Sequence, residues 1–178
     1  MKLIHMIYIG LFAALLSILS LLPPIPLPFS PVPITFQVLG IFIVSGLLTP
    51  KISTMTVLVY LLLGGIGIPV FAGGTAGVGV LLGPTGGYLL GFIPATFLSS
   101  SVLRHYKTPK TQHYIFAFSL GLIGIYLPGT LQLSAVTGLS LDKALTVGSL
   151  PYIPLDFIKI IMATWITKSL ARHLKTNT

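Results

Sequence analysis

The segment GSLPYIPLDFIKIIMATWITKSL, residues 148–170, is apolar over most of its length but carries Asp156 and Lys159 well inside it. A membrane-spanning helix needs roughly 20 mostly apolar residues, so the segment predicts a spanning helix. A charge at bilayer depth costs about 2.5–3.5 kcal/mol, and such residues usually face the interior of a helix bundle. Because the two charges are three residues apart, they lie on one side of the helix and can serve one cavity.

Five further segments upstream have the length and composition of spans, although one is short and two contain glycines. The chain therefore predicts an all-α, polytopic membrane protein, with a single transmembrane domain over residues 1–178. The six predicted spans are Leu3–Leu22, Ile34–Leu48, Ile52–Phe71, Pro84–Leu103, His113–Leu133 and Gly148–Leu170.

The basic residues alternate between the connections in a way that predicts orientation. Cytoplasmic loops of membrane proteins carry an excess of Lys and Arg. With six spans, Lys143 is the only basic residue in the connections on the outer side, and Asp142 lies next to it. Both termini are therefore predicted to be cytoplasmic, in an inner-membrane protein. The residues assigned to the cytoplasmic side are Lys2, Lys51, Arg104, Lys107, Lys110, Lys168, Arg172 and Lys175.

Composition excludes several classes of function. Only 7% of the residues are charged, against about 25% in a soluble domain, so lipid must surround most of the exterior. The net charge of +8 fits basic cytoplasmic loops better than a nucleic-acid partner. Cysteine and glutamate are absent, and no phosphate-binding loop or hydrolase motif occurs, so we expect no enzyme activity, nucleotide hydrolysis or metal site.

Two uncharged outer connections are rich in proline or glycine: PPIPLPFSPVPIT from Pro23 and FAGGTAGVGVLLGPTGGY from Phe71. Irregular backbone at membrane depth is tolerated where protein buries it or where it lines a cavity. We expect both connections to fold over the outer mouth of the bundle, with plain connectors as the alternative. Asp156 would then be reached from outside, whereas in the alternative reading the pair with Lys159 is a self-satisfied salt bridge.

Other polar residues in the spans are less specific. Each of these residues could serve either in a hydrogen bond between helices or in a ligand contact. They are Thr35, Gln37, Tyr88, Tyr126 and Gln132. In the first span, small residues recur at a spacing of four, which allows close approach of a helix from this chain or from another subunit. These residues are Gly10, Ala13, Ala14 and Ser17.

The stretches PIPLPFSPVPITFQVLG, VYLLLGGIGIPVFAGGTAGVGVLLGPTGGYLLGF and LPYIPLDFIK closely resemble the BioY family. Its members are the biotin-specific S components, or substrate-binding subunits, of energy-coupling factor (ECF) transporters. The resemblance runs from about Phe12 to Ala171. It implies a six-helix subunit that captures biotin from outside and delivers it through a transmembrane coupling subunit driven by two ATPase subunits.

The resemblance also implies roles for particular residues. Asp156 would accept bonds from the ureido N–H groups of biotin, and Lys159 would donate to the ureido oxygen or the carboxylate. The loop with Gly73 and Gly74 would close above the ligand. Biotin would be cargo and no cofactor is implied. The small residues of the first helix, Ala13 and Ser17 above all, would contact the coupling subunit.

Two positions depart from the family pattern. Leu155 stands where the family usually has glycine before the aspartate, and Gln132 stands where a tryptophan is usual in the fifth helix. Both departures are expected near the pocket, so the affinity or pose of the ligand can differ.

Three other functions compete with this interpretation. A stand-alone secondary carrier for another solute would couple transport to protonation of Asp156. A membrane hydrolase or acyltransferase would need a nucleophile and base, which the sequence does not offer as a set. A structural subunit would bind no vitamin at all.

Overall fold

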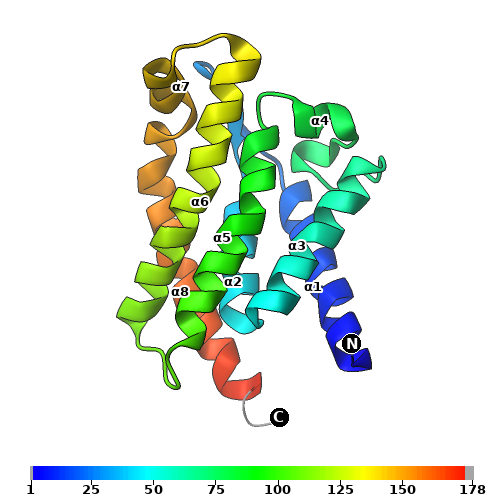
Figure 1. The fold of residues 1–178 in the computed structure, drawn as a ribbon, viewed down its shortest axis with the longest axis vertical. Helices are drawn as coiled ribbons and strands as arrows, with labels where there is room; N and C mark the ends of the chain where they lie inside the picture. The colour runs from blue at the N-terminus through cyan, green and yellow to red at the C-terminus, as the bar shows by residue number, and fades with distance from the viewer. Residues whose placement is uncertain (1, 175–178) are drawn as a thin grey trace.

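The structure is a computed structural model that describes residues 2–174. It is a bundle of helices that run roughly along the longest axis of the molecule (Figure 1). The start of the first helix and the end of the last helix lie at the same end of the bundle, called the terminal end below. The long helices of the bundle are α1 (Leu3–Leu21), α2 (Gln37–Leu47), α3 (Pro50–Gly65), α5 (Gly86–Arg104), α6 (Thr111–Thr137) and α8 (Ile153–Leu174).

Shorter elements cover the end of the bundle opposite the termini. The fold is mostly helical, as expected, but it is not all-α, because β1 (Ile25–Leu27) and β2 (Ser30–Ile34) form a small antiparallel hairpin. Proline cannot continue a helix, and it is tolerated in strands at a sheet edge, which suits this Pro-rich segment. The remaining short elements are η1 (Ala72–Gly74), α4 (Val78–Leu82), α7 (Leu141–Gly148) and η2 (Leu150–Tyr152).

Four helical stretches of residues 2–174 are long and apolar enough to cross a membrane: Leu3–Leu21, Gly86–Arg104, Thr111–Thr137 and Leu141–Ala171. The second and third predicted spans are shorter apolar helices, α2 and α3. The second prediction began too early because Ile34 belongs to β2. The third ended too late, because α3 stops at Gly65 and Gly67 follows with a φ of 104° that is accessible mainly to glycine.

Helices α5 and α6 pack closely because glycine lines their contact. A Cβ atom on Gly87 would lie 2.3 Å from the carbonyl oxygen of Pro128, and one on Gly91 would lie 2.9 Å from the Cα atom of Ile125. Small residues bring helix backbones together in this way inside membranes. The contact fixes Tyr88 at the start of α5 beside the second half of α6.

Charged side chains divide between the two ends of the bundle. Lys2, Lys51, Arg104 and Lys110 flank helices at the end where the termini lie, and α7 carries Asp142 and Lys143 at the other end (Figure 1). Lys175, which was assigned to the same side as Lys2, lies outside the described residues. Large apolar side chains face outward between the ends, as expected for a lipid-facing surface; Trp165, for example, is 77% exposed.

Candidate functional site

A cavity lies under the short elements at the end of the bundle opposite the termini. Its volume open to the centres of water molecules is about 90 Å³, several times what one water needs. The cavity is bounded by β2, the start of α2, the loop after α3, α4, the first half of α5, the middle of α6, the end of α7, η2 and the first turns of α8. Six of the residues singled out in the sequence line it: Thr35, Gln37, Tyr88, Tyr126, Asp156 and Lys159.

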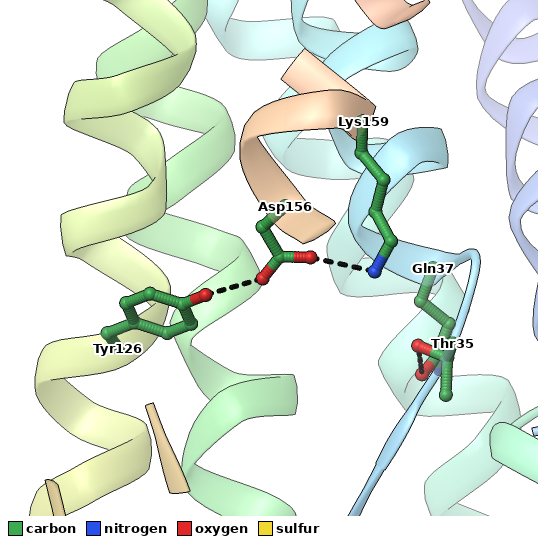
Figure 2. A network of polar contacts seen from close by, with 5 residues as sticks. All are labelled: Thr35, Gln37, Tyr126, Asp156 and Lys159. Carbon is green, nitrogen blue, oxygen red and sulfur yellow. Dashed lines mark hydrogen bonds and ion pairs between the residues drawn. The ribbon is translucent and has the colours of Figure 1, made fainter. Parts of the chain in front are cut away.

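Asp156 and Lys159 form an ion pair in the first turns of α8. The Lys159 Nζ atom donates to Asp156 Oδ1 at 2.7 Å, and the Tyr126 hydroxyl donates to Asp156 Oδ2 at 2.5 Å (Figure 2). Asp156 is 3% exposed and Lys159 is 8% exposed. A carboxylate is also favoured near a helix N-terminus, where the helix dipole is positive. The pair is therefore compensated within the protein while both groups border the cavity.

The pair keeps unused hydrogen-bonding capacity. An ionised carboxylate can accept about four hydrogen bonds, and an ammonium group can donate three. Asp156 accepts two and Lys159 donates one within residues 2–174. The remaining capacity can serve a small molecule that carries both donors and acceptors.

A second polar chain begins beside Lys159 (Figure 2). Thr35 Oγ1 donates to Gln37 Oε1 at 3.1 Å, and Gln37 Nε2 donates to the Tyr60 hydroxyl at 2.6 Å. The Tyr60 hydroxyl in turn donates to the carbonyl oxygen of Val70 at 2.9 Å. The chain links the start of α2 to the loop after α3, so it holds one wall of the cavity in position.

Three predicted site residues do not line the cavity. The Gln132 amide donates to the carbonyl oxygens of Leu81 and Gly83, at 2.8 and 2.9 Å, and so ties the end of α4 to α6. Gly73 and Gly74 have φ values of 67° and 75° and form a turn. Other residues of the same loop line the cavity, and the closure of this loop above a ligand stays a prediction.

The cavity also has lining residues that the sequence analysis did not single out. Phe71, Ala72 and Thr75 contribute the loop wall, and Tyr152 contributes the η2 wall. The Tyr152 hydroxyl donates to the carbonyl oxygen of Val32 and so fastens the hairpin to η2. Tyr152 precedes Asp156 by four residues, and residues four apart share a helix face. This spacing was a sign in the sequence that Tyr152 could lie on the same side as Asp156.

Tyr88 stands out because its hydroxyl is buried. It lies near Thr130 and Ser149, which are bonded to each other at 2.7 Å. No hydrogen-bond partner for the Tyr88 hydroxyl occurs among the described residues. The oxygen itself is buried and not open to the cavity, so other atoms of Tyr88 line the cavity wall.

The cavity combines apolar and aromatic walls with a few convergent polar groups, as small-molecule sites do. Within residues 2–174 no group of three or more His, Cys, Asp or Glu side chains could hold a metal ion. The arrangement suits reversible binding of a small molecule with an apolar body and polar ends.

The small residues of α1 point in different directions. Gly10 and Ala14 are exposed, and a Cβ atom on Gly10 would meet nothing within 4 Å. Ala13 is 1% exposed and belongs to the core, so the expectation that it contacts another subunit directly is wrong. Ser17 is half-buried, and its hydroxyl donates to the carbonyl oxygen of Ala13 at 2.9 Å. The face open to a partner therefore centres on Gly10 and Ala14.

Comparison with known proteins gives concordant matches over almost the whole chain. The BioY family model matches residues 1–176. Biotin transporter BioY2 of Lactococcus lactis subsp. cremoris (strain MG1363) is 40% identical over 97% of this chain and 93% of its own length. The probable biotin transporter BioY of Bacillus subtilis (strain 168) is 34% identical over 98% of this chain and 94% of its own length.

A solved structure has the same fold. The S-component for biotin from an ECF-type ABC transporter superposes with a TM-score of 0.88 at 34% sequence identity, over 94% of this chain and 90% of that chain. On its sequence and its fold, this chain belongs to the BioY family.

Proposed function

We propose that this multi-pass membrane protein is the biotin-binding S component of an ECF-type uptake transporter. The observation that carries the proposal is the buried pair of Asp156 and Lys159 at the cavity wall, with hydrogen-bonding capacity to spare. The relatives named above are described as biotin transporters. Biotin is the cargo of this site and not a cofactor, and the chain is a transport subunit and not an enzyme.

The chemistry of biotin fits the lining of the cavity. Its ureido group has two N–H donors and one carbonyl acceptor, its thioether ring is apolar, and its tail ends in a carboxylate. Asp156 accepts the ureido N–H bonds, and Lys159 donates to the ureido oxygen or to the carboxylate. The aromatic side chains of Phe71, Tyr88 and Tyr152 supply apolar walls. Each polar group of biotin left unpaired in this buried site would cost about 1–3 kcal/mol.

Topology follows from the charges. The chain crosses the bacterial cell membrane six times, with both termini in the cytoplasm. The basic end of the bundle then lies on the cytoplasmic side, where loops carry an excess of Lys and Arg. The cavity then opens toward the outside, from which biotin is captured. Gln132 and the turn at Gly73 and Gly74 act by shaping the loops that close over it.

Energy and partners come from other chains. The sequence has no phosphate-binding GxxxxGK[ST] loop, so ATP hydrolysis belongs to two ATPase subunits joined through a transmembrane coupling subunit. The open face at Gly10 and Ala14 receives the coupling subunit, because a surface of small residues allows a partner helix to approach closely. Nucleic acid is not a partner.

The test is purification of the chain in detergent followed by mass spectrometry of the small molecule that it retains. Biotin in near-equimolar amount is the expected result, whereas thiamin, riboflavin or no ligand would overturn the proposal. Reconstitution in liposomes separates the transport mechanisms. Biotin uptake should require the coupling and ATPase subunits together with ATP. Uptake by the chain alone, abolished by collapsing a proton gradient, would indicate a secondary carrier.

A further inference from the structure

A larger and more open hollow lies at the opposite end of the bundle from the ligand cavity. It is an open groove of about 1180 Å³ at the ends of α1, α3 and α5, where the termini lie. Helix α3 packs against both α1 and α5, and its first two turns line the groove. None of the residues that bind or enclose the proposed cargo lines it.

The rim of the groove is cationic. Lys2, Lys51 and Arg104 line it and are all exposed. Among the side chains of residues 2–171, which the structure describes, no hydrogen bond or ion pair is formed with any of these three cations. The sequence has only two acidic residues; Asp156 borders the cavity and Asp142 lies in α7 at the other end of the bundle. No acidic side chain is therefore available to neutralise this cluster.

A buried hydroxyl also borders the groove without a partner. Thr54 Oγ1 has no hydrogen-bond partner among the described residues. Its neighbours in α3 are satisfied by their own helix, since Ser53 donates to the carbonyl oxygen of Thr49 and Thr56 donates to that of Ile52. The oxygen itself is buried, so a rotation of the Thr54 side chain, which lines the groove, is needed to bring this donor to an acceptor bound there.

The inner wall of the groove is apolar, which determines the kind of anion. Ile52, Met55 and Phe97 line it, and Phe97 is 52% exposed. Phe97 precedes Arg104 on α5 by two helical turns, or about 10 Å along the axis. A phospholipid can place its headgroup phosphate at the cationic rim and its acyl chain against the apolar wall. A free anion would contact the rim alone and leave the apolar side chains uncovered.

We propose that this groove binds the headgroup phosphate of an anionic phospholipid from the leaflet at the terminal end of the bundle. Lys51 and Arg104 contact the phosphate, Thr54 donates to one of its oxygens, and an acyl chain covers Phe97 and Met55. The bound lipid fixes the ends of α1, α3 and α5 relative to one another. The inference does not depend on the identity of the cargo.

The test measures phospholipid binding to the purified chain in neutral detergent by native mass spectrometry. Phosphatidylglycerol should bind at least tenfold more tightly than phosphatidylcholine with the same acyl chains. Each cation near an anionic headgroup contributes roughly a fivefold factor. The double variant Lys51→Gln/Arg104→Gln should therefore lose about tenfold or more in affinity for phosphatidylglycerol, with phosphatidylcholine unchanged. Thr54→Val, which keeps the shape, should lose about threefold.

Lys110→Gln/Lys168→Gln is the matched control, because it removes the same charge from the same end but outside the groove. It should change the affinity for phosphatidylglycerol by less than twofold. An equal loss in both double variants would mean general charge attraction and would overturn the site. Displacement of the lipid by millimolar inorganic phosphate would assign the groove to a free anion. If Lys51→Gln/Arg104→Gln bound lipid as before but no longer co-purified with the coupling subunit, the groove would be a protein interface and the lipid site would be overturned.

Discussion

Asp156 shows how one residue can combine a structural bond with a free binding capacity. It accepts bonds from Lys159 and Tyr126, which fix the orientation of its carboxylate toward the cavity. An isolated charge would be costly at this depth, and the pairing reduces that cost without using up the acceptor capacity of the carboxylate. Binding can therefore add hydrogen bonds without first breaking the ion pair.

Asp156→Asn should weaken biotin binding at least tenfold, because the amide replaces one acceptor oxygen by a donor and leaves a ureido N–H group unpaired. Isothermal titration calorimetry on the purified variant measures the effect. Asp142→Asn is the control, since Asp142 is exposed in α7 and should leave the affinity unchanged. Unchanged binding in Asp156→Asn, with the fold retained by gel filtration, would remove Asp156 from the site.

At the scale of elements, the contact between α5 and α6 shapes the cavity. Gly87 and Gly91 let α5 approach α6 so closely that Tyr88 lies against Gly129, where a Cβ atom would be 2.3 Å from the tyrosine ring. Gln132 extends the same contact to the carbonyl oxygens at the end of α4. The departure of Gln132 from the family pattern therefore acts on the loop and not on the lining.

Gly87→Ala should lower the melting temperature clearly, because its Cβ atom would meet the Pro128 backbone and force the helices apart. Overpacking of this kind costs about 1–3 kcal/mol. Gly79→Ala is the control, since a Cβ atom there meets nothing within 4 Å and alanine favours a helix. Thermal unfolding in detergent should separate the two variants; equal melting temperatures would contradict the close α5–α6 contact.

At the scale of the whole molecule, the outer surface of α1 is the proposed route to the partner subunits. Ala14→Leu should prevent co-purification of the coupling subunit while leaving biotin affinity unchanged, because a larger side chain blocks close helix approach. Ala135→Leu offers a matched control on the exposed face of α6. Loss of the complex in both variants would show that lipid-facing bulk alone disturbs assembly.

The orientation of the whole bundle can be tested because the chain has no cysteine. Cysteines introduced singly at Lys110 and at Lys143 lie at opposite ends of the bundle. A membrane-impermeant maleimide applied to intact cells stripped of any outer barrier should label Lys143→Cys and not Lys110→Cys. The reverse pattern would invert the proposed topology, and labelling of both would contradict a spanning bundle.

The cavity-lining position of some residues was within reach of sequence reasoning, although their role in ligand binding stays a prediction. Helical spacing put Asp156 and Lys159 on one side of α8, and they do pair there. Loop residues were not predictable in the same way. Gln132 bonds to groups about 50 residues earlier in the chain, and nothing local to Gln132 indicates that contact.

Local composition and periodicity by themselves determined that this chain is mostly helical, that its helices are apolar enough for a membrane, and that its basic residues gather at one end. These properties depend on neighbours a few residues apart. Tertiary structure alone decided that a Pro-rich segment forms a hairpin, that Ala13 turns inward while Ala14 stays exposed, and that Phe71 and Tyr152 line the cavity. Those outcomes depend on long-range packing, in which the direction of a side chain is set by whichever helix or loop the fold brings beside it.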